Sequence, residues 1–358
     1  MTSLSSSNTL ASDHDAPQHE LRPKPLPLFL HMLRSEYGDD PARVAAVLAG
    51  VRVYQRAPRA AAMRREIVAQ HGRARLWGFG GEGRPIVFIP SIINGPEILD
   101  LDADRSLMRW LAARGLRALL VDWGPPEADE RDCDIGGHVR RLLLPLLNGL
   151  DEPPLMVGYC LGGTMAIAAA ALTPVHGLVT IAAPWDFAGY PENSQTEMLT
   201  LWLAAQEAAE ATGLLPIEIL QAGFWKLDPA RTIAKYARLA EVADDAGAVA
   251  HFVGVEDWAN GGPPLTLGAA RHLFEGMIER QEPGRGEWRI DGKVIDPAGL
   301  RAPMLEIISE NDRIVPAATA SGVGERLSLD LGHVGMIVGS RARETLWEPL
   351  AAWIEAHA

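Results

Sequence analysis

Cysteine is scarce in this sequence, which has only Cys133 and Cys160 among its 358 residues. Two cysteines cannot build the disulfide framework of a small secreted domain, and they cannot supply a Cys-rich zinc site. We therefore expect no metal centre, and we expect thiols that stay reduced, as they do in the cytoplasm. Each cysteine can then be judged by the residues around it.

Basic residues are fewer than acidic ones, because 33 Lys and Arg stand against 46 Asp and Glu and give a formal net charge of −13. Proteins that bind nucleic acid usually carry a basic surface, so we expect no nucleic-acid partner. The overall charge offers no attraction to an anion either, so an anionic ligand would need a local basic patch.

Long apolar runs and a secretory leader are also missing. The most apolar stretch, residues 165–185, contains Pro174 and His176, which is typical of a helix, a turn and a strand rather than of a membrane span. Residues 1–20 are polar and acidic, without the basic start and apolar centre of a signal peptide. We therefore expect a cytoplasmic protein with no membrane span, and its 47% hydrophobic residues suffice for a folded core.

From residue 80 onward, short apolar runs alternate with helical segments. This alternation predicts an α/β fold, in which buried strands form a mostly parallel sheet with helices on both faces. The stretch 186–298 interrupts the alternation with mostly helical and irregular sequence, which predicts a cap inserted over the active site. The expected strands are 85–90, 118–123, 154–159, 177–182, 303–308 and 326–329.

The residues before the sheet are expected to form a disordered arm and then a helical segment. We interpret the arginines of that segment as a solvated helix face rather than as a surface for an anion or a partner. These arginines are Arg52, Arg56, Arg59, Arg64 and Arg65. The predicted boundaries are 1–25 for the arm, 26–73 for the helical segment, 74–185 and 299–358 for the two parts of the core, and 186–298 for the cap.

The most informative motif is Gly158-Tyr159-Cys160-Leu161-Gly162, which joins a predicted strand to a helix of small residues. It has the pattern of a nucleophile elbow, with Cys at the position usually held by Ser. The sharp turn needs small neighbours, and the two glycines provide them. The start of the helix can stabilise both an oxyanion and a thiolate. We therefore interpret Cys160 as a nucleophile rather than as a buried structural cysteine.

A nucleophile elbow requires an acid and then a histidine later in the chain. Among the histidines that follow Cys160, His333 comes after the last predicted strand in a tight loop, so it is the candidate base. The acid is expected after the strand 303–308, where we choose Asp312. Asp186, after the fourth strand, is a competitor for this role, and a turn aspartate is the alternative reading of Asp312.

Two backbone amides are expected to bind an oxyanion. One belongs to Leu161, directly after the candidate nucleophile, and the other belongs by position to Ile92, in the loop after the strand 85–90. The glycines of the elbow are not a phosphate-binding loop, because the Gly-Lys-Ser/Thr ending of such a loop is missing.

At these residues the chain resembles the polyhydroxyalkanoate synthases, especially the short catalytic-subunit type that works with a partner subunit. The similarity spans residues 75–340, and the Cys-centred elbow is its most specific block, because most relatives in the wider fold use Ser. The blocks that carry the resemblance are Pro90–Pro96 with Ile98–Leu101, Ala113–Leu116 with Val121–Gly124, Gly158–Thr164, Ile290–Asp296, Asn311–Pro316 and Gly332–Gly335.

The resemblance implies an α/β-hydrolase fold with an inserted cap. It also implies an acyltransferase that moves (R)-3-hydroxyacyl groups from CoA, through a thioester on Cys160, to the hydroxyl of a growing polyester. His333 would be the base and Asp312 the acid, with the Ile92 and Leu161 amides holding the oxyanion. Acyl-CoA is a substrate here, so no cofactor is implied. A homodimer or a partner synthase subunit, and a location at the polymer granule surface, are further implications.

Two features depart from the family pattern. Asp312 and His333 are only 21 positions apart, so the helix between them must be about two turns long or missing. Arg313 stands where the family usually has His. Two alternatives therefore remain: a thioesterase or esterase of the same fold with a Cys nucleophile, and a non-catalytic relative that binds a synthase or a granule. The intact Cys, Asp and His argue against the second.

Overall fold

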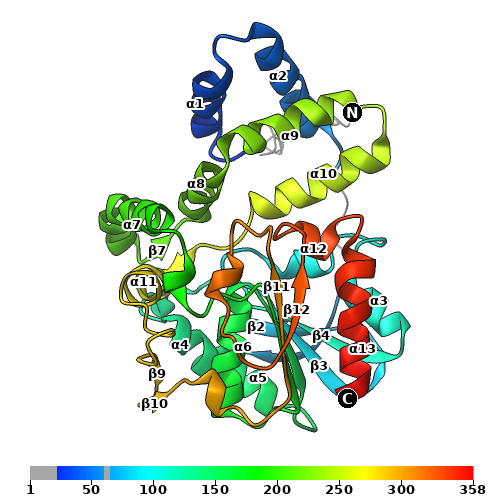
Figure 1. The fold of residues 1–358 in the computed structure, drawn as a ribbon, viewed down its shortest axis with the longest axis vertical. Helices are drawn as coiled ribbons and strands as arrows, with labels where there is room; N and C mark the ends of the chain where they lie inside the picture. Colours follow the sequence, from blue (N-terminus) through cyan, green and yellow to red (C-terminus); the bar gives the residue numbers. More distant parts are fainter. Residues whose placement is uncertain (1–21, 60–64, 358) are drawn as a thin grey trace, which may run out of the picture.

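The computed structural model describes residues 22–59 and 65–357, and its central feature is an eight-stranded sheet (Figure 1). The strands of this sheet are β1 (Glu66–His71), β2 (Ala74–Gly78), β3 (Glu82–Ile89), β4 (Leu116–Asp122), β5 (Leu155–Tyr159), β6 (Gly177–Ile181), β11 (Met304–Ser309) and β12 (Glu325–Leu329). Their order across the sheet is β1-β2-β4-β3-β5-β6-β11-β12. The six strands from β4 to β12 in this order run parallel, whereas β1 and β2 are antiparallel to their neighbours.

Helices cover both faces of the sheet, and each face has its own apolar core. The helices of the core are α3 (Leu107–Ala113), α4 (Ile135–His138), η4 (Val139–Leu143), α5 (Leu144–Asn148), α6 (Leu161–Leu172), α12 (Gly335–Val338), η9 (Arg343–Trp347) and α13 (Glu348–His357). Helices α4, α5 and α6 pack on one face, and α3, α12 and α13 pack on the other. The predicted α/β fold with a mostly parallel sheet is confirmed.

The central strands are buried on both faces, which is why apolar runs marked them in the sequence. Every residue of β5, β6 and β11 is buried. A strand covered on both faces needs apolar side chains at every position rather than at alternate ones. The observed bounds of all six predicted strands lie close to the expected ones, and β12 is the mostly exposed strand among them.

The segment before β2 differs from the expected helical stretch 26–73. It contains two helices, α1 (Leu26–Tyr37) and α2 (Pro41–Arg56), and then the strand β1. Helix α2 ends because Pro58 disfavours helical geometry at Ala57, which is extended with ψ of 139°. Strand β1 is at the sheet edge and mostly exposed, so it has little apolar pattern to reveal it. The expected disordered arm falls largely outside the described residues, but residues 22–25 form a turn.

The interruption after β6 consists of helices, one short hairpin and one short strand pair whose two strands are distant in sequence. Its elements are η5 (Phe187–Gly189), α7 (Glu192–Thr212), β7 (Leu214–Leu215), α8 (Ile217–Leu227), α9 (Pro229–Glu241), α10 (Ala246–Ala259), β8 (Leu265–Thr266), α11 (Leu267–Arg271), η6 (His272–Glu279), β9 (Arg289–Ile290), β10 (Lys293–Val294) and η7 (Pro297–Gly299). Strand β7 pairs with β8, and β9 pairs with β10.

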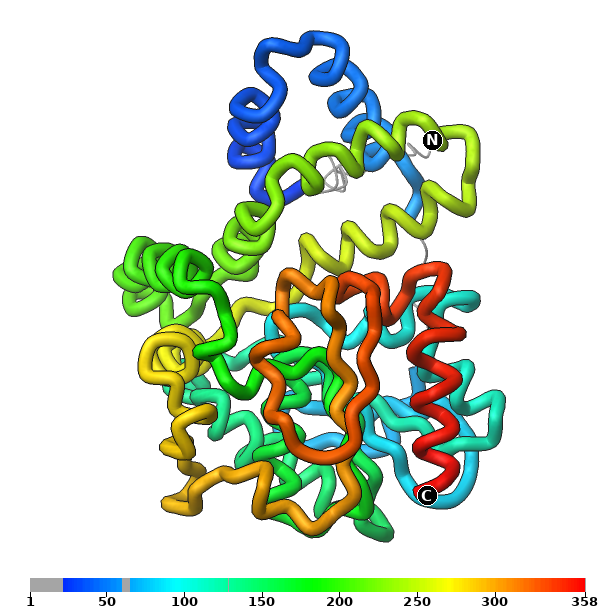
Figure 2. Tube along the Cα trace, viewed as in Figure 1, coloured from blue at the N-terminus to red at the C-terminus, as the bar shows by residue number. Residues whose placement is uncertain are grey.

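Helices α1 and α2 do not pack on the sheet. Figure 2 shows them beside α9 and α10, above the core. They share a separate apolar cluster with α8, α9 and α10, in which Phe29, Tyr54, Trp225 and Tyr236 are all buried. The N-terminal helices and the middle of the interruption therefore form one helical layer, although some 180 residues of sequence separate them.

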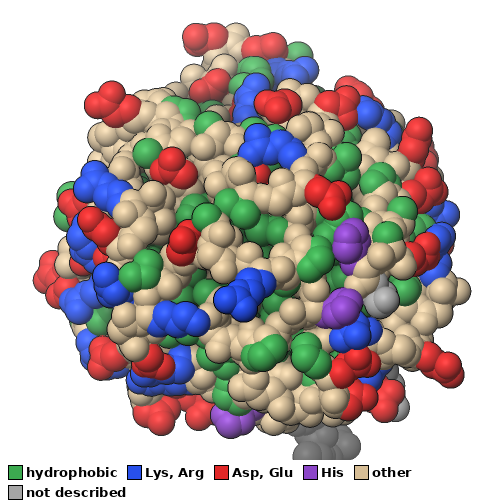
Figure 3. Space-filling model, turned by 60° about the horizontal axis from the view of Figure 1, so that its bottom comes forward, with side chains coloured by type: hydrophobic (Ala, Val, Ile, Leu, Met, Phe, Trp, Pro, Cys, Tyr) green, Lys and Arg blue, Asp and Glu red, His purple; other side chains and the backbone are tan. Residues whose placement is uncertain are grey.

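The described residues contain neither a membrane-spanning helix nor a cluster of metal-ligating side chains. No helix there combines the length and the apolar character that crossing a membrane requires. In residues 22–59 and 65–357, no three His, Cys, Asp or Glu side chains gather in a way that could hold a metal ion. On the face in Figure 3, basic and acidic side chains are interspersed.

Candidate active site

Cys160 lies at the turn between β5 and α6, as the elbow motif predicts. Its φ of 56° and ψ of −135° are unusual for a residue with a side chain. The turn leaves no room beside it: a Cβ on Gly162 would lie 2.1 Å from the Ile89 carbonyl oxygen, and one on Gly158 would lie 2.4 Å from the Gly163 Cα. The glycines therefore let β5, α6 and the end of β3 approach closely enough to hold the cysteine in this conformation.

His333 and Asp312 meet on the same edge of the sheet, where the loops after β12 and β11 come together. The His333 Nδ1 donates a hydrogen bond of 2.6 Å to the Asp312 Oδ2, and both side chains are buried. The Tyr159 ring stacks on the imidazole with 4.9 Å between centroids, and its hydroxyl donates to the His333 carbonyl at 3.2 Å. The ring is thus fixed with its other nitrogen free for a different partner.

The backbone orients Asp312 for this contact. Its Oδ1 accepts hydrogen bonds from the amides of Ile314 at 2.8 Å and Val315 at 2.9 Å, which leaves Oδ2 for the imidazole. Asp186, the competing candidate, instead caps a helical turn by accepting from the Ala188 amide at 3.1 Å. The geometry pairs His333 with Asp312, and the chemical role of each residue remains a prediction.

His333 and Cys160 are electrostatically coupled. Burial favours the neutral imidazole, but the charges of Asp312 and Cys160, with the hydrogen bond to Asp312, outweigh burial and raise the pKa of His333 to about 10. This pKa favours the imidazolium at neutral pH, which contacts the Asp312 carboxylate through Nδ1 and shares a cavity with Cys160. This arrangement is what a Cys–His nucleophile requires.

The raised pKa of His333 predicts how stability depends on pH. The folded protein keeps this proton up to about pH 10, whereas an unfolded histidine loses it near 6.5. The stabilisation is therefore complete below pH 6.5 and is lost as the pH rises through 10. We expect urea unfolding between pH 6 and pH 10 to show a steeper loss of unfolding free energy in the parent than in His333→Gln. Equal slopes in the two proteins would contradict this expectation.

The two predicted oxyanion amides lie on neighbouring segments. Leu161 is the first residue of α6, and Ile92 is in the loop after β3, next to Ser91 and Ile93, which line a cavity with Cys160. Among the described backbone amides, neither Ile92 nor Leu161 donates to another loop, turn or cap carbonyl. These amides are thus available, and their role remains a prediction.

Two cavities reach Cys160. The smaller, of about 160 Å³, contains His333 and is bordered by polar and aromatic side chains of α8, α9 and α10. The larger, of about 460 Å³, is mostly apolar and extends between the core and α7, α8 and η6. Its apolar lining includes Phe187, Met198, Leu201, Leu220, Phe224, Leu273, Phe274 and Ile278.

Sequence analysis missed several residues that surround Cys160. Tyr159 lies inside the elbow motif, but nothing in the motif indicates that its ring stacks on His333. Lys235 lines the smaller cavity, where its ammonium pairs with Glu256 at 2.5 Å. Lys235 and Glu256 belong to the helical layer, on α9 and α10, and no motif marks them in the sequence. Arg313, the departure from the family pattern, pairs with Asp228.

Comparison with known proteins gives no matching family model but several similar curated proteins. The chain is 28% identical over 313 residues to the poly(3-hydroxyalkanoate) polymerase subunit PhaC of Haloferax mediterranei, covering 80% of this chain and 63% of that protein. It is 28% identical over 292 residues to the subunit of Haloarcula marismortui, covering 76% and 61%. The chain is similar to polyhydroxyalkanoate polymerase subunits. The resemblance inferred from the sequence motifs is thereby confirmed.

The extent of the match varies among the relatives. The PhaC subunit of Allochromatium vinosum is 27% identical over 290 residues, which is 75% of this chain and 80% of the relative. The chain spans less than two thirds of the length of either archaeal relative.

Solved structures support the fold. BpoC of Mycobacterium tuberculosis aligns with a TM-score of 0.51 at 17% identity, covering 83% of this chain and 100% of that one. A lipase-like protein of Sulfolobus solfataricus aligns with a TM-score of 0.50 at 13% identity, and the alignment also covers 83% of this chain and 100% of that one. At such identities the likeness concerns the fold alone, and the predicted α/β-hydrolase fold is confirmed.

Proposed function

We propose that this protein is an acyltransferase of the polyhydroxyalkanoate synthase type. In this proposal it moves 3-hydroxyacyl groups from CoA to the hydroxyl of a polyester chain through a thioester on Cys160. One observation carries the proposal: a cysteine at a nucleophile elbow shares a cavity with a buried His333–Asp312 pair, in a chain similar to polymerase subunits.

Acylation is the first step. The Cys160 Sγ attacks the thioester carbonyl carbon as a thiolate, and the Ile92 and Leu161 amides hold the resulting oxyanion. The carbon–sulfur bond to CoA then breaks, and the departing CoA sulfur takes the proton from the His333 imidazolium. Free CoA leaves, and the enzyme holds an acyl group on Cys160 beside a neutral imidazole.

Transfer is the second step. The neutral His333 accepts the proton of the polyester's terminal hydroxyl, whose oxygen attacks the acyl carbonyl. The bond to Sγ breaks, an ester forms, and the thiolate and imidazolium return. Asp312 stabilises the imidazolium of the free enzyme before acylation and after transfer, since its carboxylate is 2.6 Å from Nδ1.

The apolar cavity supports an alcohol rather than water as the acceptor. A site bordered by apolar and aromatic side chains holds little water, which slows hydrolysis of the acyl-enzyme. Acyl-CoA is a substrate in this proposal and no resident cofactor takes part. We further propose action in the cytoplasm at a polymer granule surface, either as a homodimer or with a partner synthase subunit.

Product analysis tests the proposed function. The purified chain would be incubated with 3-hydroxybutyryl-CoA, alone and with a candidate partner subunit, while CoA release and product size are followed in the same reaction. The proposal predicts oligoester in at least one of the two reactions. Free hydroxy acid released in step with CoA, with no oligoester in either reaction, would contradict the proposed synthase activity and support a thioesterase instead.

The larger cavity predicts a dependence on acyl length. We expect Met198→Trp, which fills part of this cavity, to lower kcat/KM about tenfold for 3-hydroxydecanoyl-CoA and much less for 3-hydroxybutyryl-CoA. The matched control is Leu203→Trp on the same helix, because Leu203 is 71% exposed. Steady-state kinetics with both substrates provides the measurement. Equal effects of Met198→Trp on the two substrates would contradict the assignment of this cavity to the acyl chain.

A further inference from the structure

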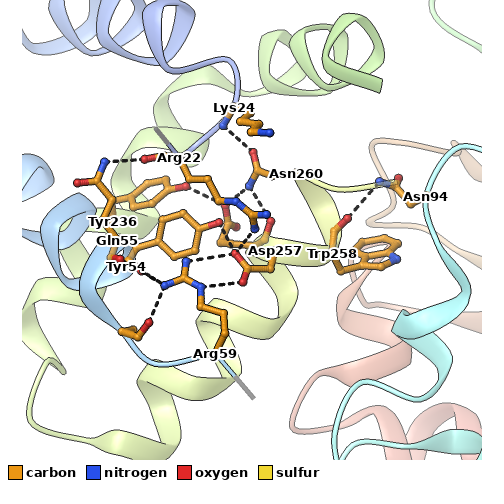
Figure 4. A network of polar contacts seen from close by, with 12 residues as sticks. Arg22, Lys24, Tyr54, Gln55, Arg59, Asn94, Tyr236, Asp257, Trp258 and Asn260 are labelled. Atoms are coloured by element: carbon orange, nitrogen blue, oxygen red, sulfur yellow. Dashed lines mark hydrogen bonds and ion pairs between the residues drawn. The ribbon is translucent and has the colours of Figure 1, made fainter. Parts of the chain in front are cut away.

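The last turn of α10 lies between two segments that are distant in sequence. On one side it contacts Arg22 and Lys24, which precede α1, and Tyr54 near the end of α2, as Figure 4 shows. On the other side it contacts residues 94 and 95, in the loop that follows β3. This turn is therefore the physical connection between the N-terminal helices and the loop that contains Ile92.

Asp257 is the centre of the first contact. Its carboxylate accepts hydrogen bonds from the Arg22 Nη1 at 2.5 Å, the Tyr54 hydroxyl at 2.7 Å and the Arg59 Nε at 2.9 Å. The Arg59 guanidinium also lies over the Tyr54 ring, 4.9 Å from its centroid. The next turn adds a backbone contact, in which the Lys24 amide donates to the Asn260 side chain at 3.0 Å.

These contacts are stronger than an ordinary surface ion pair. The side chains of Arg22, Arg59 and Asp257 are only 18%, 17% and 21% exposed. Burial works against the charged carboxylate, yet the hydrogen bonds from Arg59 and Tyr54 and the charges of both arginines lower the pKa of Asp257. Two arginines therefore compensate one carboxylate in a partly desolvated place, where charge-assisted hydrogen bonds are strong.

The second contact holds the loop after β3. The Asn94 Nδ2 donates to the carbonyl oxygens of Trp258 at 3.3 Å and Gly261 at 3.1 Å. The indole nitrogen of Trp258, the residue next to Asp257, donates to the Gly95 carbonyl at 2.8 Å. The final turn of α10 thus fixes the loop only two residues after Ile92.

We propose that Asp257 is a positioning residue, which transmits the placement of the N-terminal helices to the Ile92 amide through α10 and Asn94. The inference rests on the proposed acyl transfer at Cys160. In this arrangement the pairs with Arg22 and Arg59 fix the end of α10, and α10 in turn fixes the oxyanion loop. Loss of the pairs displaces the loop without touching the Cys160 thiol or the His333–Asp312 pair.

Two reactions of Cys160 separate positioning from general stability. Acylation by an acyl-CoA builds an oxyanion and needs the Ile92 amide, whereas alkylation by iodoacetamide forms a carbon–sulfur bond and releases iodide without an oxyanion. A displaced loop therefore slows acylation alone. Partial unfolding alters both reactions and lowers the Tm as well.

The experiment compares the full-length parent with Asp257→Asn, which keeps the size of the side chain but removes its charge. We expect kcat to fall about tenfold with KM within twofold of the parent, because removal of a whole oxyanion donor costs 10²- to 10³-fold. The rate of Cys160 alkylation should stay within twofold. Hydrogen exchange of the amides in residues 91–99 should become faster, and Asp257→Glu should restore part of kcat.

Two further variants sharpen the test. Glu355→Gln removes an exposed carboxylate that pairs with Arg114, far from this loop, and should leave kcat and exchange unchanged. Asn94→Ala should lower kcat, and its combination with Asp257→Asn should be hardly worse than Asn94→Ala alone, because both act through one connection.

Distinct results would overturn the inference. Parental kcat and parental exchange in Asp257→Asn would show that Asp257 does not position the loop. Equal losses of acylation and alkylation with a lowered Tm would assign it a purely structural role. If the parent itself showed no acylation by acyl-CoA, the proposed function would fail, while faster exchange in Asp257→Asn would still support the connection from α2 to the loop.

Discussion

Replacement of Cys160 by alanine is expected to abolish CoA release. Cys160 is the cysteine that lies at the elbow and shares a cavity with His333, so no other thiol can accept the acyl group there. CoA release by purified Cys160→Ala should fall to the background rate, while its Tm stays near that of the parent. Cys160→Ser should retain only a small residual rate, because a neutral hydroxyl lacks the reactivity of a thiolate.

Cys133→Ala is the matched control. Cys133 is buried against His138, with 3.6 Å between sulfur and Nδ1, and burial raises the pKa of its thiol to about 11. Such a thiol stays protonated and inert at neutral pH, so this variant should release CoA at nearly the parental rate. Near-parental turnover by Cys160→Ala, or inactivity of a folded Cys133→Ala, would refute the assignment of the nucleophile.

The second large effect is expected at the buried histidine. His333→Gln removes the group that protonates the leaving CoA and deprotonates the acceptor, and kcat should fall by roughly 10²- to 10⁴-fold. Asp312→Asn should also lower kcat strongly, because an amide at the same place cannot stabilise an imidazolium. Both effects would appear in initial rates of CoA release.

Asp186→Asn provides the control for the acid. Asp186 caps the turn at Ala188 and makes no contact with the imidazole among the described hydrogen bonds, so kcat should change little. A severe loss in Asp186→Asn, with an active Asp312→Asn, would reverse the assignment of the acid. A folded and fully active His333→Gln would remove the histidine from the proposed mechanism.

Burial explains which parts of the fold the sequence predicted. Strands β5, β6 and β11 are buried along their whole length, so they appear as apolar runs. Strand β1 is almost entirely exposed and is held by backbone pairing with β2, which leaves little signal in the side chains. Pattern alone therefore merged β1 with the helices before it.

Amphipathic helices reveal that they have a partner but not which one. Helices α1 and α2 were expected as a preface to the core, and the structure packs them on α9 and α10 instead. The interpretation of the arginines as a solvated face was wrong for Arg59 and Arg65, which pair with Asp257 and Asp100. Arg64 lies outside the described residues.

The site was predictable where topology orders it. The elbow marks Cys160, and the carboxyl ends of β11 and β12 bring Asp312 and His333 to the same edge of the sheet. Their short separation in sequence has a simple cause: only a single turn, η8 (Ala317–Thr319), lies between β11 and β12, so the usual helix is missing. The contacts of Asp257 were not predictable, because they join residues about 200 positions apart with no shared motif.

An acyl-enzyme on Cys160 is the most direct test of the central claim. The protein would be mixed with 3-hydroxybutyryl-CoA, quenched in acid within the first turnovers, digested and measured by mass spectrometry. The proposed mechanism predicts a hydroxybutyryl adduct on the peptide that contains Cys160, none on the peptide that contains Cys133, and none in Cys160→Ala. CoA release by the parent without any adduct on Cys160, or with the adduct on another residue, would contradict it.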